Sequence, residues 1–386
     1  MQTSRPLRVL LLVDYVTPVG GAERFVMGLA ENLPRDRIEA WVCSTRVGDQ
    51  EAVRALMRAH IRHISLGRTS KRDVHRLQKL AVLLRRERFD VVHAHKFGSN
   101  VWGSLIGRAC RVPVVLAHEH TWSYAGDPLR MWIDGHVVGK LATRFIAVSE
   151  HDRERMIALE GVPAGKVLVM PTGYVPFPSS RQDTDLRAEL GLSRDVPLVG
   201  VAAVLRRQKA LNVLVDAHAR LITRVTDAHL VIAGDGPCRQ ELERHIDRLG
   251  IAGFVHLLGQ RSDVTAILHA VDVAALSSDW EGMPLFVFEC MATNTPLVAT
   301  SVGGLREIIQ AGTTGMLVPP QDPEKLADAL QMLLTNPILA KRLAAAASRR
   351  LEEFTIQAVA IRFADLYEEL SRAVDGRRWG NAGSAP

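Results

Sequence analysis

Apolar runs of strand length alternate with helix-like stretches along most of the chain, and this alternation occurs twice. In the first half the expected strands are 7–15, 39–44, 90–95, 113–118, 144–148 and 166–170. In the second half they are 196–203, 229–233, 255–259, 271–276, 296–300 and 315–318. Strands that alternate with helices form parallel sheets covered on both faces. The sequence therefore predicts an α/β protein of two Rossmann-like, doubly wound domains that face a central cleft.

A segment rich in proline, serine and turn residues, PTGYVPFPSSRQDTD, separates the two halves. The 386 residues suffice for two domains of ordinary size. We expect an N-terminal domain over 1–172, a linker over 173–185 and a C-terminal domain over 186–360. A helix over 361–375 is expected to return to the N-terminal domain, and 376–386 to be a disordered tail.

Charge is concentrated in the first half, where residues 1–170 carry 26 Lys and Arg against 17 Asp and Glu. The most basic stretch is 68–90, in which apolar residues recur at helical spacing among Arg72, Arg76, Lys79 and Arg85. Such a helix can lie on an anionic membrane surface. It can equally be the solvated face of a packed helix. Nothing else in the sequence indicates nucleic-acid binding.

The cysteines and the apolar runs indicate a cytoplasmic protein, with association with the inner face of the membrane as the open alternative. Cys43, Cys110, Cys238 and Cys290 show neither metal-ligand spacing nor a disulfide framework. No apolar run is long enough to span a bilayer, and the first one is too short for a signal peptide.

One stretch, LSSDWEGMPLFVFECM, places two carboxylates eight positions apart around a turn that opens an apolar helix. Pro284 suits the first turn of a helix, so we expect a loop up to Met283 and a helix from Leu285. Glu281 is then on the loop and Glu289 on the helix. The N–H groups at a helix start form an anion site that often holds phosphate. Two acids beside a phosphate site suit a sugar nucleotide. The alternative without a ligand is an ordinary helix start whose acid is stabilised by the helix dipole.

The segment EGMPLFVFE resembles the signature of the retaining glycosyltransferases of family four, which have the GT-B fold. The resemblance covers about residues 7–370 and is strongest over 196–320. It implies that Glu281 faces the donor sugar and that Glu289 binds the ribose. It also implies that the backbone of Gly282, Met283, Pro284 and Leu285 meets the phosphates. The N-terminal domain would then bind the acceptor and the C-terminal domain the nucleotide sugar.

The resemblance extends to two further glycine-rich junctions, VGGAER and SVGGLREII. Taken alone, such a junction is most often only a turn. The resemblance places Gly20 and Gly21 against the donor phosphate or sugar.

A basic segment, AVLRRQKA, follows the first expected strand of the second half. Cations there can neutralise a departing diphosphate. Lys209 matches the family's lysine, whereas Val204 stands where the family has arginine and Ala210 where it has glycine. Arg206 is the expected substitute for the missing arginine and Arg207 the competitor; solvent exposure is the alternative for both.

Two further loops complete the expected donor site. By resemblance, the base of the nucleotide lies near Gly259, Gln260 and Arg261, held by backbone groups. His120 matches by position the histidine that the family brings against the donor sugar, close to the reacting carbon.

Histidines gather at the ends of two expected strands, with His93 and His95 on one and His118 and His120 on the next. They carry no recognised metal-ligand spacing, so we expect no metal and no other cofactor. A core or turn position is the alternative to function for His95 and His120.

Together these features predict a retaining hexosyltransferase that uses a UDP- or GDP-sugar. The expected partners are this donor and a lipid-linked or polysaccharide acceptor in cell-surface polysaccharide or glycolipid synthesis, with possible membrane contact through 68–90 and no nucleic acid. One alternative is a catalytically inactive, sugar-nucleotide-binding subunit of a transferase complex. Another is a phosphorylase or sugar-nucleotide epimerase of the same fold.

Overall fold

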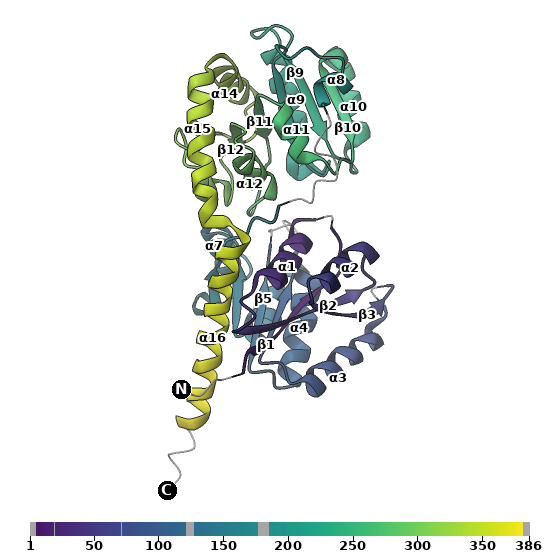
Figure 1. The fold of residues 1–386 in the computed structure, drawn as a ribbon, viewed down its shortest axis with the longest axis vertical. Coiled ribbons are helices and arrows are strands. Elements are labelled where there is room, and N and C mark those ends of the chain that lie inside the picture. The colour runs from purple at the N-terminus through teal and green to yellow at the C-terminus, as the bar shows by residue number, and fades with distance from the viewer. Residues whose placement is uncertain (1–4, 19, 71, 121–126, 177–184, 381–386) are drawn as a thin grey trace. The chain divides into compact units, whose positions relative to one another are not determined.

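The computed structural model describes residues 5–18, 20–70, 72–120, 127–176 and 185–380, and the chain divides into two compact units (Figure 1). Unit 1 consists of Met1–Val175 and Phe354–Pro386, and unit 2 consists of Pro176–Glu353. No helix within the described ranges combines the length and apolar character needed to cross a bilayer.

Unit 1 is built on a seven-stranded sheet in the order β3-β2-β1-β4-β5-β6-β7, with parallel pairing throughout. Its strands are β1 (Leu7–Val13), β2 (Ile38–Arg46), β3 (Arg62–Arg68), β4 (Val91–His95), β5 (Val114–His118), β6 (Arg144–Ala147) and β7 (Val167–Val169). Its main helices are α1 (Gly21–Asn32), α2 (Gln50–Arg58), α3 (Gln78–Glu87), α4 (Phe97–Ala109), α5 (Pro128–Ile133), α6 (Gly139–Leu141), α7 (Glu150–Ala158) and α16 (Ile356–Gly380). Shorter turns are η1 (Val74–Leu77), the π-helical η2 (Asp134–Val138) and η3 (Ala164–Lys166).

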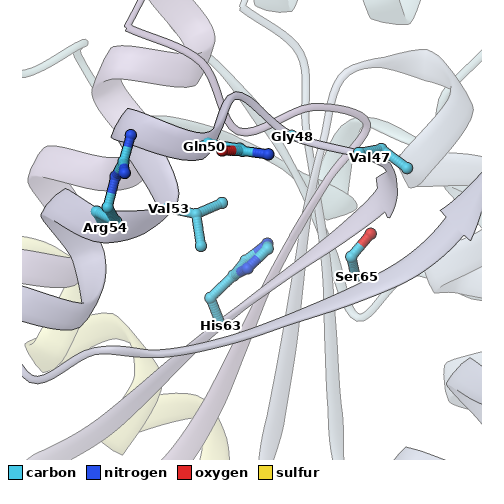
Figure 2. Close-up of a pocket in the computed structure, with 7 residues that line it drawn as sticks. All are labelled: Val47, Gly48, Gln50, Val53, Arg54, His63 and Ser65. Carbon is cyan, nitrogen blue, oxygen red and sulfur yellow. The ribbon is translucent and has the colours of Figure 1, made fainter.

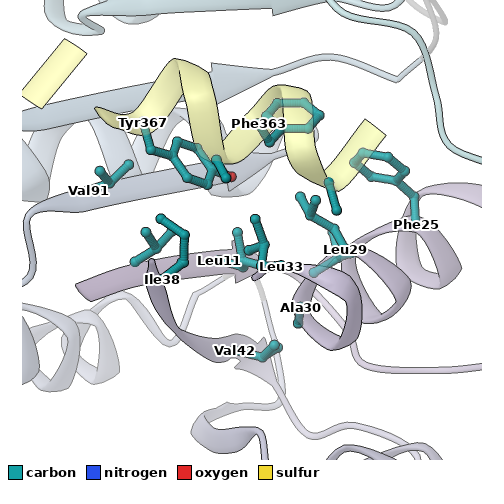
Figure 3. Close-up of a cluster of buried hydrophobic side chains, with 14 of the residues drawn as sticks. Leu11, Phe25, Leu29, Ala30, Leu33, Ile38, Val42, Val91, Phe363 and Tyr367 are labelled. Atoms are coloured by element: carbon teal, nitrogen blue, oxygen red, sulfur yellow. The ribbon is translucent and has the colours of Figure 1, made fainter. Parts of the chain in front are cut away.

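Alternate residues of β1 supply two different cores, which is why the sheet needs helices on both faces. Leu11 packs in a cluster with Phe25 of α1 and with Phe363 and Tyr367 of α16 (Figure 3). Leu10 and Leu12 point the other way, into a cluster with residues of α3. Because side chains alternate along a strand, a continuous apolar run is expected where both faces are buried.

Unit 2 repeats this plan with a six-stranded parallel sheet in the order β10-β9-β8-β11-β12-β13. The strands are β8 (Leu198–Ala202), β9 (His229–Ala233), β10 (Val255–Gly259), β11 (Val273–Leu276), β12 (Leu297–Thr300) and β13 (Met316–Val318). The helices are α8 (Leu186–Glu189), α9 (Leu211–Leu221), α10 (Arg239–Arg248), α11 (Val264–Ala270), α12 (Leu285–Ala292), α13 (Leu305–Ile308), α14 (Pro323–Thr335) and α15 (Pro337–Arg350). Single turns are η4 (Arg207–Lys209), η5 (Ala252–Phe254) and η6 (Leu351–Phe354), of which the last residue belongs to unit 1. The predicted pair of doubly wound domains is confirmed.

Two segments differ from the prediction. Strand β3 was not expected, because its charged ends and partly exposed residues give no continuous apolar run. Helix α16 continues to Gly380, into the expected tail, whose remaining residues, 381–386, lie outside the described residues. Most of the expected linker, 177–184, also lies outside them.

The basic stretch 68–90 packs its apolar side chains into unit 1. Leu77, Leu80 and Leu84 are buried in the cluster beneath β1, whereas Arg72, Lys79, Arg85 and Arg86 are exposed. The apolar face that the sequence offers to a membrane is therefore mostly used by the core, and the exposed part of this stretch is mainly cationic.

Candidate active site

The candidate site of unit 2 lies where the strand order of its sheet reverses. Strands β8 and β11 are neighbours although β9 and β10 come between them in the sequence. Ligands of such sheets bind beyond the carboxyl ends of the strands at this point of reversal. The segment that follows β8 carries Lys209, and the segment that follows β11 carries Glu281.

Glu281 and Lys209 form a nearly buried ion pair. Lys209 Nζ lies 2.5 Å from Glu281 Oε1, and the side chains are 17% and 5% exposed, respectively. Ser278 Oγ donates to the same carboxylate oxygen at 2.6 Å, and Gln208 Nε2 donates to Oε2 at 3.3 Å. The sequence suggested separate partners for Lys209 and Glu281, whereas here they bind each other.

The backbone around this pair has two left-handed positions. Ala210 has φ 42° and ψ 44°, a conformation that favours glycine. This explains why a glycine is usual at that position in the family that the sequence resembles. Gly303 has φ 47°, and a Cβ there would lie 1.9 Å from the backbone oxygen of Glu281. Gly304 N donates to the same oxygen at 3.2 Å, so the SVGGLREII junction holds the backbone of Glu281 in place.

Helix α12 begins beside Glu281, as expected. Pro284 occupies the N-cap position with φ −70° and ψ 130°, immediately before the first helical residue, Leu285. The first turn holds no acid, and the N-cap residue makes no side-chain hydrogen bond to it. Glu289 lies on the helix and is only 7% exposed. Glu281, the helix start and Glu289 therefore stand in one continuous segment, with Gly282 and Met283 buried between them.

The other expected donor-site residues of unit 2 differ in accessibility. Arg206 and Arg207 are both exposed, so burial does not favour either as the substitute arginine. Gly259 ends β10 with φ 68°, and Gln260 after it is exposed. The guanidinium of Arg261 bonds Asp263 at 2.7 Å and Glu189 at 2.7 Å, and these partners raise its pKa. Its guanidinium is thus engaged by two acids, so any role of this loop in holding the base falls to backbone groups and to Gln260.

The first glycine junction lies in unit 1, at the carboxyl end of β1. Gly20 is the N-cap of α1 with φ 108°, and a Cβ there would lie 2.5 Å from Glu23 Oε2. Glu23 is buried and accepts from Lys96 Nζ at 2.7 Å. Lys96 has φ 69°, which is uncommon for a residue with a side chain. Sequence reasoning missed both Glu23 and Lys96; the acid in the first turn after Gly20-Gly21 was the available signal.

Histidines of β4 and β5 form a compact network in unit 1. His95 Nδ1 lies 3.0 Å from His120 Nε2, and His93 Nε2 lies 3.2 Å from His118 Nδ1. His93 Nδ1 also bonds Tyr367 Oη at 2.7 Å. Burial lowers the pKa of His93, His95 and His118 well below the ordinary value, and burial with the charge of Lys96 lowers the pKa of His120 to about 3.

Among the described residues, one group has the proximity that a metal site needs. His93, His95 and His118 are buried, and each offers a ring nitrogen within 4.8 Å of the others. Both nitrogens of His93 already make hydrogen bonds, however, to His118 and Tyr367. Only the Nε2 atoms of His95 and His118 have no partner within the described ranges. Two nitrogens are fewer than the ligands of an ordinary zinc site.

A pocket of about 410 Å³ opens beside β2 and β3 in unit 1 (Figure 2). It is lined by Val47, Gly48, Gln50, Val53, Arg54, His63 and Ser65. His63 Nε2 lies 3.0 Å from Ser44 Oγ. No sequence motif indicated this pocket, because its lining comes from the unexpected strand β3 and from α2 with the loop before it.

The expected residues thus fall into two groups. Unit 2 brings Glu281, Lys209 and the start of α12 together, while Gly20, Gly21 and His120 belong to unit 1.

Known proteins resemble both units. Residues 19–176 match the family model described as Glycosyltransferase Family 4, and residues 196–336 match the one described as Glycosyl transferases group 1. The chain is 30% identical to the alpha-D-kanosaminyltransferase of Streptomyces kanamyceticus over 74% of this chain and 79% of that protein. It is 26% identical to the Escherichia coli UDP-Gal:alpha-D-GlcNAc-diphosphoundecaprenol alpha-1,3-galactosyltransferase over 85% and 88% of the two chains. Anabaena HepE, solved with UDP and glucose, superimposes with a TM-score of 0.81 at 22% identity, over 94% of this chain and 100% of that one.

Proposed function

The chain belongs to the group 1 glycosyltransferases, and on that premise we propose that it moves a hexosyl unit from a UDP- or GDP-sugar to an acceptor hydroxyl with retention of configuration. The observation that carries this proposal is the Lys209–Glu281 pair beside the start of α12. The site has a cation, an acid and backbone N–H groups at the point where the strand order of the sheet reverses. The cation and the N–H groups suit the phosphates of a nucleotide sugar, and the acid suits its hydroxyls.

Each donor group has a partner in unit 2. Lys209, Arg206 and the N–H groups after Gly282 stabilise the departing diphosphate, because they place positive charge where negative charge develops. Glu281 accepts hydrogen bonds from the sugar. For this, Lys209 must give up part of its contact with Glu281 and bind the phosphate instead. Glu289 accepts from the ribose, and the backbone of 259–261 holds the base.

For unit 1, the family resemblance assigns Gly20 and Gly21 to the donor phosphate or sugar and His120 to the anomeric carbon. The bond between that carbon and the diphosphate oxygen breaks, and a bond to the acceptor oxygen forms on the same face. The acceptor proton passes to the departing phosphate oxygen. No side chain acts as a covalent nucleophile in this scheme, and neither a metal nor another cofactor takes part.

The names of the relatives support a UDP-sugar and a lipid-linked acceptor. HepE was solved with UDP, and the E. coli relative is named for a UDP-galactose donor and a diphosphoundecaprenol-linked acceptor. An anionic acceptor at a membrane also suits the exposed cations of 72–88, which would contact the cytoplasmic surface by charge rather than by apolar insertion.

The test is to incubate the protein with UDP- and GDP-hexoses and with GlcNAc-diphosphoundecaprenol, and to measure the release of nucleoside diphosphate. We expect one donor to be consumed and the new glycosidic bond to keep its anomeric configuration by proton NMR. An inverted product would refute retention. Absence of release with every donor, together with tight nucleotide binding, would favour the inactive binding subunit instead.

A further inference from the structure

His120 is held in one orientation by three aromatic rings of unit 1. Its Nε2 lies 3.0 Å from Nδ1 of His95, the last residue of β4. The ring of His118 stacks on it, with centroids 4.2 Å apart and planes 17° from parallel. The edge of Phe25 approaches at a centroid distance of 5.3 Å. The hydrogen bond to His95 therefore determines which nitrogen of a well-placed ring carries the proton.

The surroundings of His95 determine whether His95 or His120 donates the hydrogen bond between them. His95 is fully buried, and its Nε2 has no partner within the described ranges. A neutral imidazole has one N–H group and one bare nitrogen. A proton on Nε2 would bury an N–H without an acceptor, whereas buried N–H groups are rarely left without one. The proton of His95 thus belongs on Nδ1, from which it is donated to Nε2 of His120.

The neighbouring histidines obey the same rule. Nε2 of buried His118 also has no partner among the described residues, so its proton belongs on Nδ1 and is donated to Nε2 of His93. His93 then carries its own proton on Nδ1, which it donates to the hydroxyl oxygen of Tyr367, 2.7 Å away. One assignment therefore satisfies all three hydrogen bonds of the network.

We propose that His95 is a positioning residue that keeps His120 protonated on Nδ1, so that His120 meets the sugar as a neutral hydrogen-bond donor and not as a base. This role rests on the proposed function, whereas the tautomer rests on the geometry alone. Among the described residues, the groups around His120 include His95, His118, Phe25 and the charged Lys96. The low pKa of His120 agrees with a ring that stays neutral at pH 7.

The direct test is nitrogen-15 NMR of the full-length protein, since the shifts of Nδ1 and Nε2 distinguish the two neutral tautomers. In the wild type we expect His120 protonated on Nδ1. H95N keeps an amide N–H near the position of Nδ1, so this variant should retain the tautomer and most of the kcat. H95L should give a mixture of tautomers and lower kcat about 10-fold to 100-fold, with a smaller change in the donor KM.

The matched control is Y367F, which removes a hydrogen bond of the same network without contacting His120. It should leave both the His120 tautomer and kcat unchanged. A wild-type His120 protonated on Nε2 would overturn the inference, as would an H95L variant with normal kcat and tautomer. Stoichiometric zinc in the purified protein would also overturn it, because the bare nitrogens would then be ligands. If the tautomer is as expected but no donor turns over, the proposed function fails and the hydrogen-bond assignment stands.

Discussion

Lys209 Nζ lies 2.5 Å from Glu281 Oε1, and the pair joins segments that follow two neighbouring strands, β8 and β11, of the unit 2 sheet. Both side chains are largely buried, so the pair costs desolvation that its attraction must offset. Replacing such pairs with apolar residues often stabilises a protein, which means that stability alone does not explain this one. The proposed role in ligand binding would explain the pair, because a diphosphate could then bind the lysine while the sugar binds the carboxylate.

The pair should behave differently when one partner or both are changed. K209M leaves Glu281 buried without its cation, so it should lower the free energy of unfolding by about 3 kcal/mol or more and abolish transfer. The double variant K209M/E281Q should recover most of the stability but none of the activity. Urea unfolding and donor turnover measure the two effects. K325M, at a lysine whose side chain is 62% exposed, is the control and should match the wild type. An active K209M would contradict the assigned role.

Replacing Ala210 with glycine should make the folded protein more stable. Its φ of 42° is unfavourable for a residue with a Cβ, so A210G should raise the free energy of unfolding by about 0.5–1 kcal/mol. A202G, in the extended backbone of β8, should lower it by a similar amount because glycine there only loses conformational freedom. Thermal or urea unfolding of both variants checks the prediction, and destabilisation by A210G would show that the position is not strained.

Gly303 should be intolerant of a side chain because of Glu281. In G303A the new Cβ would meet the Glu281 oxygen at 1.9 Å, so the loop that carries Glu281 must move. We expect a loss of about 2 kcal/mol or more and at least a 10-fold loss of transfer. G312A is the matched control, since Gly312 also has a positive φ (74°) but its Cβ would meet nothing within 4 Å. It should cost about 1 kcal/mol of strain and keep activity; equal losses of activity would refute the specific role of Gly303.

Asp134 should make unit 1 less stable as pH rises. Burial, with Glu119 and Glu160 nearby, raises the pKa of this carboxyl from 3.8 to about 9. The unfolded chain releases this proton near pH 4 whereas the folded chain keeps it until about pH 9, so the unfolded state is favoured increasingly between these limits. D134N removes the titration and should therefore gain stability relative to the wild type as pH rises. Unfolding free energies at pH 4.5, 6 and 8 measure this, and a difference independent of pH would contradict it.

The strands of this fold were largely readable from the sequence, because buried parallel strands are short continuous apolar runs. Strand β3 was not, since its partly exposed residues include charged side chains at both ends. The start of α12 was readable for a local reason, namely a proline next to an apolar helical segment. The direct bond between Lys209 and Glu281 was not, because it depends on β8 and β11 being neighbours in the sheet.

The histidines show the same limit. Their positions at the ends of β4 and β5 follow from the strand pattern, but their hydrogen bonds depend on strand pairing and on Tyr367 of α16, far along the chain. Lys96 could not be predicted as a site residue, because the sequence does not indicate that a lysine adopts a positive φ. Arg261 was expected near the base, yet its ion pairs with Glu189 and Asp263 appear only in the folded unit.

The donor site is tested most directly by nucleotide binding to the wild type and to two variants of unit 2. A ligand bound only by the folded state raises the melting temperature, so UDP, GDP and ADP should be compared in thermal-shift assays. We predict that one nucleotide, UDP by preference, raises the Tm of the wild type and of E241A, an exposed site on α10, but shifts E289A much less. Equal shifts in E241A and E289A, or no shift of the wild type at millimolar nucleotide, would contradict a donor site built on Glu281, Lys209 and Glu289.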